Sequence, residues 1–104
     1  MTGSSQERRK ANRIVIAVPV ELKTAEGELL AESRNISNDG MLIQSPVPLS
    51  IGSRVEMTFS IPRQEHLDEM VHLHCGGMVV RVEPLENGFG IGITWHGASV
   101  CTAG

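Results

Sequence analysis

Apolar and polar residues alternate along much of this chain, and this period of two is the strongest constraint on its fold. In the stretch 14–22, apolar residues occupy every second position: Ile14, Ile16, Val18, Val20 and Leu22. Successive side chains of an extended strand point to opposite faces, so this stretch is predicted to be a β-strand with one buried face. Pro19 cannot donate a ladder hydrogen bond, which predicts an edge or a bulge in this strand.

Five further short strands are predicted, and residues typical of turns separate them. They cover residues 28–37, 41–44, 55–61, 71–82 and 89–95. Gly76-Gly77, inside the longest of them, predicts a bulge or a sharp bend that lets a sheet curl. No stretch shows a convincing helical period. The chain is therefore predicted to be all-β, and closure into a small barrel would remove the strand edges.

The charge of the chain is divided unevenly. Four basic residues and one acidic residue lie near the N-terminus: Arg8, Arg9, Lys10, Arg13 and Glu7. The remaining residues carry five basic and eleven acidic side chains, so a basic segment precedes an acidic body. We expect a flexible basic arm over residues 1–13, a barrel over residues 14–95 and a disordered tail over residues 96–104. This arrangement predicts a small, local anion site.

Two polar stretches hold the candidate functional residues. Arg9-Lys10-Ala11-Asn12-Arg13 precedes the first strand, and Asn35-Ile36-Ser37-Asn38-Asp39-Gly40 ends the second. A guanidinium can bind phosphate through two parallel hydrogen bonds and lie flat on a purine ring. Short polar side chains at a strand end can hydrogen-bond to the edge of a base. Gly40 is predicted to adopt a backbone angle that other residues resist and to leave room for a ligand.

These stretches resemble the two motifs of the PilZ domain, a bacterial receptor for cyclic di-GMP. The family carries RxxxR before its first strand and Asp/Asn-x-Ser-x-x-Gly at the end of its second. Gly77-Met78-Val79-Val80-Arg81-Val82 is also similar to the family's G-x-V-x-R-V strand. The resemblance implies a six-stranded antiparallel β-barrel of Greek-key type with little or no helix. Two departures are Asn35, where the family often has Asp, and a tail without the helix that often follows the barrel.

The resemblance implies a cyclic di-GMP binding module that acts as a second-messenger receptor or adaptor. The arginines of the arm would bind phosphate and stack on guanine, while Asn35 and Ser37 would bind a guanine edge. An additional arginine at the position of Arg8 is associated with two stacked ligands. The ligand would clamp the arm onto the barrel and alter a surface for an unidentified downstream protein, in motility, biofilm formation or exopolysaccharide regulation. The predicted ligand-binding residues are Arg8, Arg9, Arg13, Asn35, Ser37 and Gly40.

Other functions stay open as alternatives. A degenerate barrel could work through protein contacts alone, and a small barrel could bind nucleic acid, although an acidic body with few aromatic residues disfavours the latter. No nucleophile–base pair suggests an enzyme. His72 and His74 share a strand face, but Cys75 points to the opposite one, so neither a metal nor a cofactor is expected.

The cysteines and the hydropathy of the chain bear on its compartment. Cys75 and Cys101 show no metal-binding or CxxC spacing, so we expect two reduced thiols. No apolar run approaches the length of a membrane span, and the N-terminus lacks an apolar signal region. We therefore expect a cytoplasmic protein without membrane insertion.

Overall fold

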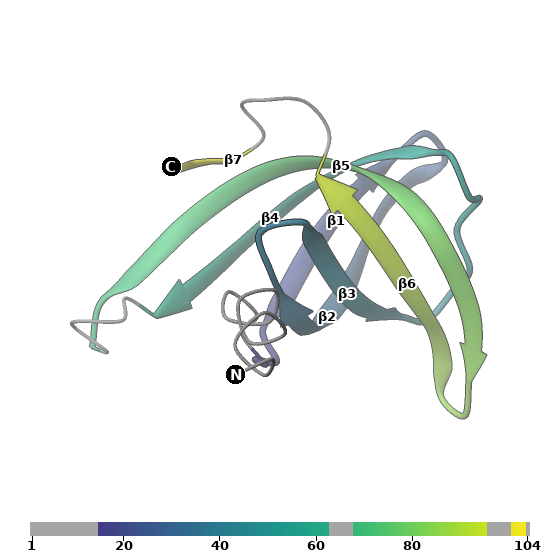
Figure 1. The fold of residues 1–104 in the computed structure, drawn as a ribbon, viewed down its shortest axis with the longest axis horizontal. Helices are drawn as coiled ribbons and strands as arrows, with labels where there is room; N and C mark the ends of the chain where they lie inside the picture. The colour runs from purple at the N-terminus through teal and green to yellow at the C-terminus, as the bar shows by residue number, and fades with distance from the viewer. Residues whose placement is uncertain (1–14, 63–67, 96–100, 104) are drawn as a thin grey trace, which may run out of the picture.

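The computed structural model describes residues 15–62, 68–95 and 101–103, which form β-strands, turns and irregular connections (Figure 1). The strands are β1 (Pro19–Thr24), β2 (Gly27–Ile36), β3 (Gly40–Ser45), β4 (Arg54–Pro62), β5 (Met70–Leu85), β6 (Gly88–Trp95) and β7 (Cys101–Ala103). Within these ranges, no helix has the length and hydrophobicity needed to cross a bilayer.

Six antiparallel strands close into a barrel. Their order is β4-β1-β2-β3-β6-β5, and β5 pairs back with β4 to complete the circle. After the β1–β2–β3 meander the chain crosses to place β4 beside β1, which is the spatial order of a Greek key. The predicted all-β, six-stranded barrel is confirmed. The short strand β7 adds to β5 outside this circle.

The longest strand, β5, belongs to two parts of the barrel. Its first half pairs with β4 from Met70 to Met78, and its second half pairs with β6 from Gly77 to Leu85. Figure 1 shows the strand arching over the barrel between these halves, which confirms the bend predicted near Gly76-Gly77. A Cβ on Gly77 would lie 2.9 Å from the carbonyl oxygen of Thr94, so a side chain does not fit at the bend.

Aliphatic side chains from alternate positions fill the interior. In β4, Val55, Met57 and Phe59 are buried, whereas Glu56 and Thr58 between them are exposed. Side chains from the other five barrel strands complete the core: Val20, Leu22, Ala31, Ile36, Met41, Ile43, Cys75, Val79, Ile91 and Ile93. The period of two in the sequence therefore corresponds to an inner apolar and an outer polar face, and burial of the inner face is the main force that stabilises the barrel.

The start of β1 differs from the prediction. The strand begins at Pro19, because the backbone N–H of Val18 donates to the Ser33 hydroxyl at 3.0 Å rather than to a main-chain carbonyl. The predicted alternation nevertheless continues upstream, since Ile16 and Val18 pack against the core. Ile14 lies outside the described residues.

Two expectations about the C-terminal part need correction. Cys101–Ala103 form β7, which pairs with Leu73–Cys75 of β5, so these three residues of the expected disordered tail have strand structure. The expectation of two reduced thiols is wrong, because Cys75 is disulfide-bonded. Cys101 is the other cysteine of the chain and is the register partner of Cys75. Residues 96–100 and 104 lie outside the described ranges.

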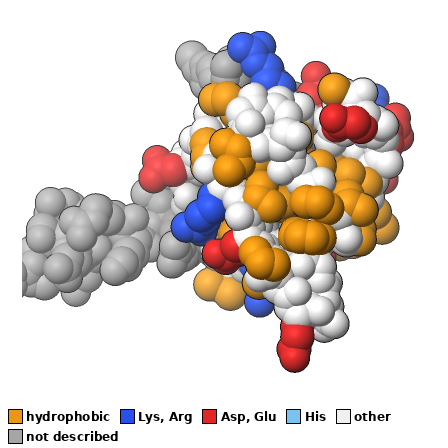
Figure 2. Space-filling view, turned by 90° about the vertical axis from the view of Figure 1, so that its right-hand side faces the viewer, with side chains coloured by type: hydrophobic (Ala, Val, Ile, Leu, Met, Phe, Trp, Pro, Cys, Tyr) orange, Lys and Arg blue, Asp and Glu red, His pale blue; other side chains and the backbone are white. Residues whose placement is uncertain are grey.

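Hydrophobic side chains also gather on the outside of the barrel. Figure 2 shows a patch of them on the side formed by the second half of β5 and the connection between β3 and β4. Val47 and Ile51 in this connection are 45% and 66% exposed, and Leu85 at the end of β5 is 38% exposed. A 2.7 Å hydrogen bond from the Gly52 N–H to the Val79 carbonyl joins the connection to β5. Patches of this kind often mark surfaces that contact other proteins.

Two leucines on neighbouring strands provide a test of the barrel interior. Leu22 is completely buried, whereas Leu30 is 61% exposed. Leu22→Ala is expected to lower the free energy of unfolding by about 2–5 kcal/mol, because it leaves a cavity. The matched Leu30→Ala is expected to change it by less than about 0.5 kcal/mol. Urea denaturation measures both, and equal effects would contradict the assignment of inner and outer faces.

Candidate functional site

The predicted site stretch Asn35–Gly40 forms the end of β2 and the turn into β3. The Ser37 N–H donates to the Gly40 carbonyl at 2.8 Å, and the Asp39 N–H donates to the Ser37 hydroxyl at 3.2 Å. The hydroxyl expected to bind ligand thus also holds the turn. This local bonding is the usual way in which serine stabilises a turn.

The end of β6 holds the same turn from the other side. The indole Nε1–H of Trp95 donates to the Ser37 carbonyl at 3.0 Å. The Trp95 backbone N–H and the Thr94 hydroxyl both donate to the Asp39 carbonyl at 3.1 Å. These three long-range hydrogen bonds fix the turn to β6, so its polar side chains are carried on a rigid support.

The backbone angle of Gly40 differs from the one predicted. It is absent from the glycines with positive φ, which are Gly27, Gly52 and Gly88. A Cβ on Gly40 would instead collide with the carbonyl group of Ile93 and would lie 2.9 Å from the Thr94 Cα. The expectation of an unusual backbone angle is therefore wrong, and the residue is glycine because the backbone of β6 passes close to it.

An open depression of about 430 Å³ lies on the outer face of the barrel beside this turn. Its lining brings together the three predicted barrel residues, Asn35, Ser37 and Gly40. The other predicted site residues, Arg8, Arg9 and Arg13, lie outside the described residues. The remaining lining comes from the turn and from β3, β5 and β6: Asp39, Met41, Leu42, Val80, Arg81, Gly92, Ile93 and Thr94.

Asn35 faces the depression because of a β-bulge in β2. The pairing of β2 with β3 shifts between Ser33 and Asn35, which leaves Arg34 as the extra residue. Ser33 and Ile36 are buried, whereas Arg34 is exposed and Asn35 is partly exposed. In a regular strand Asn35 would point to the same side as the buried Ser33. The bulge therefore turns its amide out of the core.

The chain that follows the basic arm is held against β2 close to the depression. The buried Ser33 accepts a hydrogen bond from the Val18 N–H and donates one to the Ile16 carbonyl. The Ser33 N–H also donates to the Val18 carbonyl at 2.9 Å. Ser33 precedes Asn35 by two residues, so the described start of the chain runs along the strand that carries Asn35.

The described part of the barrel is acidic. Its residues include four Lys or Arg and ten Asp or Glu side chains, a formal net charge of −6. The depression itself is lined by one residue of each sign, Arg81 and Asp39. An anion bound here would meet one cationic side chain of the barrel, so most of the positive charge would have to come from elsewhere.

A second polar cluster lies on the outer face of β4 and β5. His74 Nδ1 is 3.1 Å from the Thr58 hydroxyl, and its Nε2 is 3.4 Å from a Glu56 carboxylate oxygen. His72 Nδ1 is 2.5 Å from the Ser60 hydroxyl. These are paired side chains on an exposed sheet surface. In the described part of the chain, no group of three or more His, Cys, Asp or Glu is placed to hold a metal ion.

The fold and the motif residues agree with a match to a known family. The model of the PilZ domain matches residues 7–102. The chain belongs to the PilZ domain family. Members are cyclic di-GMP receptors and adaptors that also bind partner proteins and are generally not enzymes. The match includes residues 7–13 of the arm and ends within β7.

Two solved structures share the fold. The inhibitor of motility MotI/DgrA of Bacillus subtilis is 17% identical with a TM-score of 0.69, over 85% of this chain and 42% of that one. This chain thus spans less than half the length of MotI/DgrA. The PilZ domain of CeSA from a cellulose-synthesising bacterium is 23% identical with a TM-score of 0.55, over 83% and 82% of the two chains. No curated protein matches the sequence significantly.

Arg81 is the one basic residue among the lining residues that the sequence did not predict as site residues. It belongs to the stretch Gly77–Val82, which resembles a strand of the family. The strand period alone, however, assigns it to the same side as the buried Val79. The charge of Arg81 is the sequence signal for an outward direction, because an arginine in the core of a small barrel would lack a partner.

Two glycines test the close approach of β6 to the turn. Gly40→Ala is expected to lower the free energy of unfolding by about 1–3 kcal/mol, because its methyl group meets the β6 backbone. Gly76→Ala serves as the control, since a Cβ there meets no atom within 4 Å. Thermal and urea denaturation measure both. A Gly40→Ala protein as stable as the control variant would show that the turn can move away from β6.

Proposed function

We propose that this PilZ domain binds cyclic di-GMP in the depression beside the Ser37–Gly40 turn, and that its basic arm closes over the bound ligand. The observation that supports this most directly is the contact of Ser33 with Ile16 and Val18. This contact holds Ile16 and Val18, which follow the arm, against β2, two residues before Asn35. It supports a position of the first motif of the family near the second.

Chain geometry supports this closure. Arg13 precedes Ile16 by three residues, so their Cα atoms are at most about 11 Å apart. An arginine side chain extends this reach further, and Arg9 lies four residues before Arg13. A reach of this size supports closure of the arm over the depression without a rearrangement of the barrel.

The charge of the molecule explains why an arm would be needed. Cyclic di-GMP carries two negatively charged phosphates, and the described barrel has a formal net charge of −6. The guanidinium groups of Arg9 and Arg13 would supply the phosphate contacts and could stack on guanine. Asn35, turned outward by its bulge, would hydrogen-bond to a guanine edge. Arg8 would contribute to a second, stacked ligand.

The output of binding would be a change of surface rather than a chemical reaction. Arm closure would present a new surface to an unidentified downstream protein. The hydrophobic patch visible in Figure 2 is an available contact area for it, as are the exposed side chains of Val47, Ile51 and Leu85. MotI/DgrA inhibits motility, and CeSA belongs to a cellulose-synthesising bacterium. Motility control and exopolysaccharide synthesis are therefore the processes proposed for this chain, and the cytoplasm is its proposed location.

Titration calorimetry with cyclic di-GMP tests the proposal. The whole chain is expected to bind with a dissociation constant of about 1 μM or lower. Arg9→Ala and Arg13→Ala are each expected to weaken binding by about 10- to 100-fold, because each removes a charge-assisted contact. Deletion of residues 1–13 should weaken it more than either substitution. The stoichiometry reports whether one or two ligands bind.

Arg54→Ala is the matched control, since this arginine lines a different depression at the start of β4. It should leave the affinity within about threefold of that of the unchanged chain. Full affinity after deletion of residues 1–13 would rule out the closing arm. The absence of any binding at 100-fold higher ligand concentrations would favour the alternative barrel that works through protein contacts alone.

A further inference from the structure

A second β-bulge lies in β5 and changes the direction of one charged side chain. Val79 pairs with Ile93 and Arg81 pairs with Gly92, so Val80 is the extra residue. Val79 is completely buried, whereas Val80 is 50% exposed and Arg81 is exposed as well. In a regular strand Arg81 would share the inward direction of Val79. The bulge moves it to the outer face.

This bulge is similar to the one in β2. The residues that follow the two bulges, Asn35 and Arg81, lie in one row across the sheet. Asn35 pairs with Leu42, Leu42 pairs with Gly92, and Gly92 pairs with Arg81. Residues directly opposite each other in a sheet project from the same face. Asn35 and Arg81 therefore stand at opposite ends of a row that crosses four strands, with an apolar side chain and a glycine between them.

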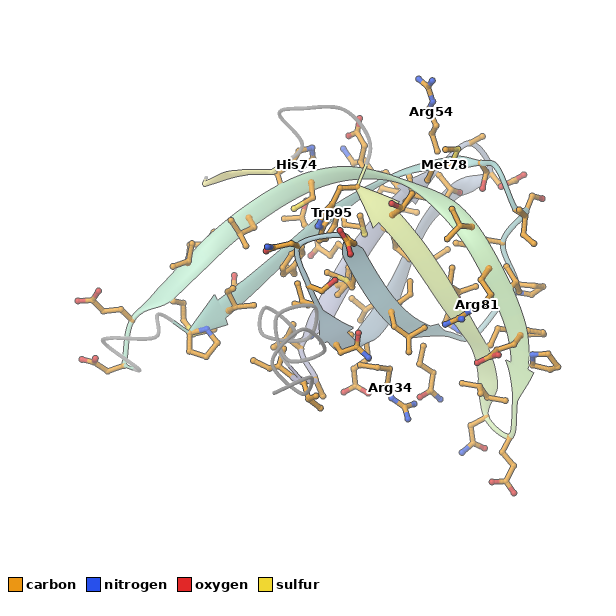
Figure 3. All side chains as sticks on the ribbon, viewed as in Figure 1. Arg34, Arg54, His74, Met78, Arg81 and Trp95 are labelled. Atoms are coloured by element: carbon orange, nitrogen blue, oxygen red, sulfur yellow. The ribbon has the colours of Figure 1, made fainter. Side chains whose placement is uncertain are left out.

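Gly92 gives the Arg81 side chain its path. A Cβ on Gly92 would lie 3.4 Å from the Arg81 Cβ and 3.7 Å from its Nε, so the arginine stem passes over β6 at this point. Figure 3 shows Arg81 reaching from β5 across β6. Among the described residues, none forms a hydrogen bond or an ion pair with this guanidinium. Arg81 is one of the residues that line the depression.

We propose that Arg81 is a specificity-determining residue that binds the O6/N7 edge of a guanine in the ligand; this inference rests on the proposed function. A purine ring can lie over Leu42, with Asn35 on one side and, on the other, the Arg81 guanidinium, whose stem covers Gly92. The guanidinium fork matches the two acceptors O6 and N7 of guanine. Adenine presents an amino donor in place of O6, so Arg81 would select against it.

A cycle of protein and ligand changes tests this contact. Affinities are measured by calorimetry for the unchanged chain and for Arg81→Met, each with cyclic di-GMP and with its 7-deazaguanine analogue, which lacks N7. Arg81→Met is expected to weaken cyclic di-GMP binding by about 10- to 100-fold. The analogue is expected to bind the unchanged chain several-fold more weakly than cyclic di-GMP. In Arg81→Met this difference should shrink towards one, because the two changes remove the same contact.

Two further variants define the role. Arg81→Lys keeps the charge but lacks the fork, and it should lose about as much affinity as Arg81→Met. Arg54→Met removes an arginine that points away from the barrel in Figure 3. It should change neither the affinity for cyclic di-GMP nor that for the analogue. Thermal melting confirms that each variant is folded, as expected for exposed side chains.

The outcomes separate this inference from the proposed function. An unchanged ratio of the two ligands in Arg81→Met, or full affinity in Arg81→Lys, would overturn the guanine contact and leave cyclic di-GMP binding intact. A chain that binds neither ligand would overturn both proposals. If Arg81→Met binds cyclic di-GMP with unchanged affinity, the inference is overturned, and recognition of guanine rests on Asn35 and the arm alone.

Discussion

The double use of β5 is the constraint on which the rest of the barrel depends. One strand pairs with β4 along its first half and with β6 along its second, and these two ladders close the sheet. Closure requires the strand to bend where the ladders overlap, at Gly77, and a side chain there would meet β6. The bend also brings β6 across the barrel so that its end, Trp95, reaches the β2–β3 turn.

The site is assembled where the regular strand pattern is interrupted. Arg34 and Val80 are extra residues in their strands, and each interruption turns the next polar side chain, Asn35 or Arg81, to the outer face. Gly92, which has no side chain, makes room for the stem of Arg81. A barrel with perfect alternation would bury both polar side chains at a cost of several kcal/mol. Local departures from a regular strand thus coincide with the residues expected to bind ligand.

The sequence sufficed for the fold because the barrel follows from a repeated, local signal. Several strands show their own alternation, and glycine or polar residues mark most of the turns. The family resemblance identified Asn35, Ser37 and Gly40, and the structure places these three around one depression. What could not be predicted depends on neighbours that are distant in sequence. The reason for glycine at position 40 lies in the β6 backbone, and the bonding of Cys75 depends on β7 as a neighbour.

The arrangement of charge gives the barrel and the arm separate tasks. A barrel with ten acidic and four basic side chains over its described residues repels a dianion at long range, and the depression offers one guanidinium against one carboxylate. Such a surface can select a base through Asn35 and Arg81 but holds little charge with which to retain phosphate. The arm carries that charge, and Ile16, which follows the arm in the sequence, is held against β2 by Ser33. Affinity would then require the arm to be ordered, which couples occupancy of the site to the shape of the surface around it.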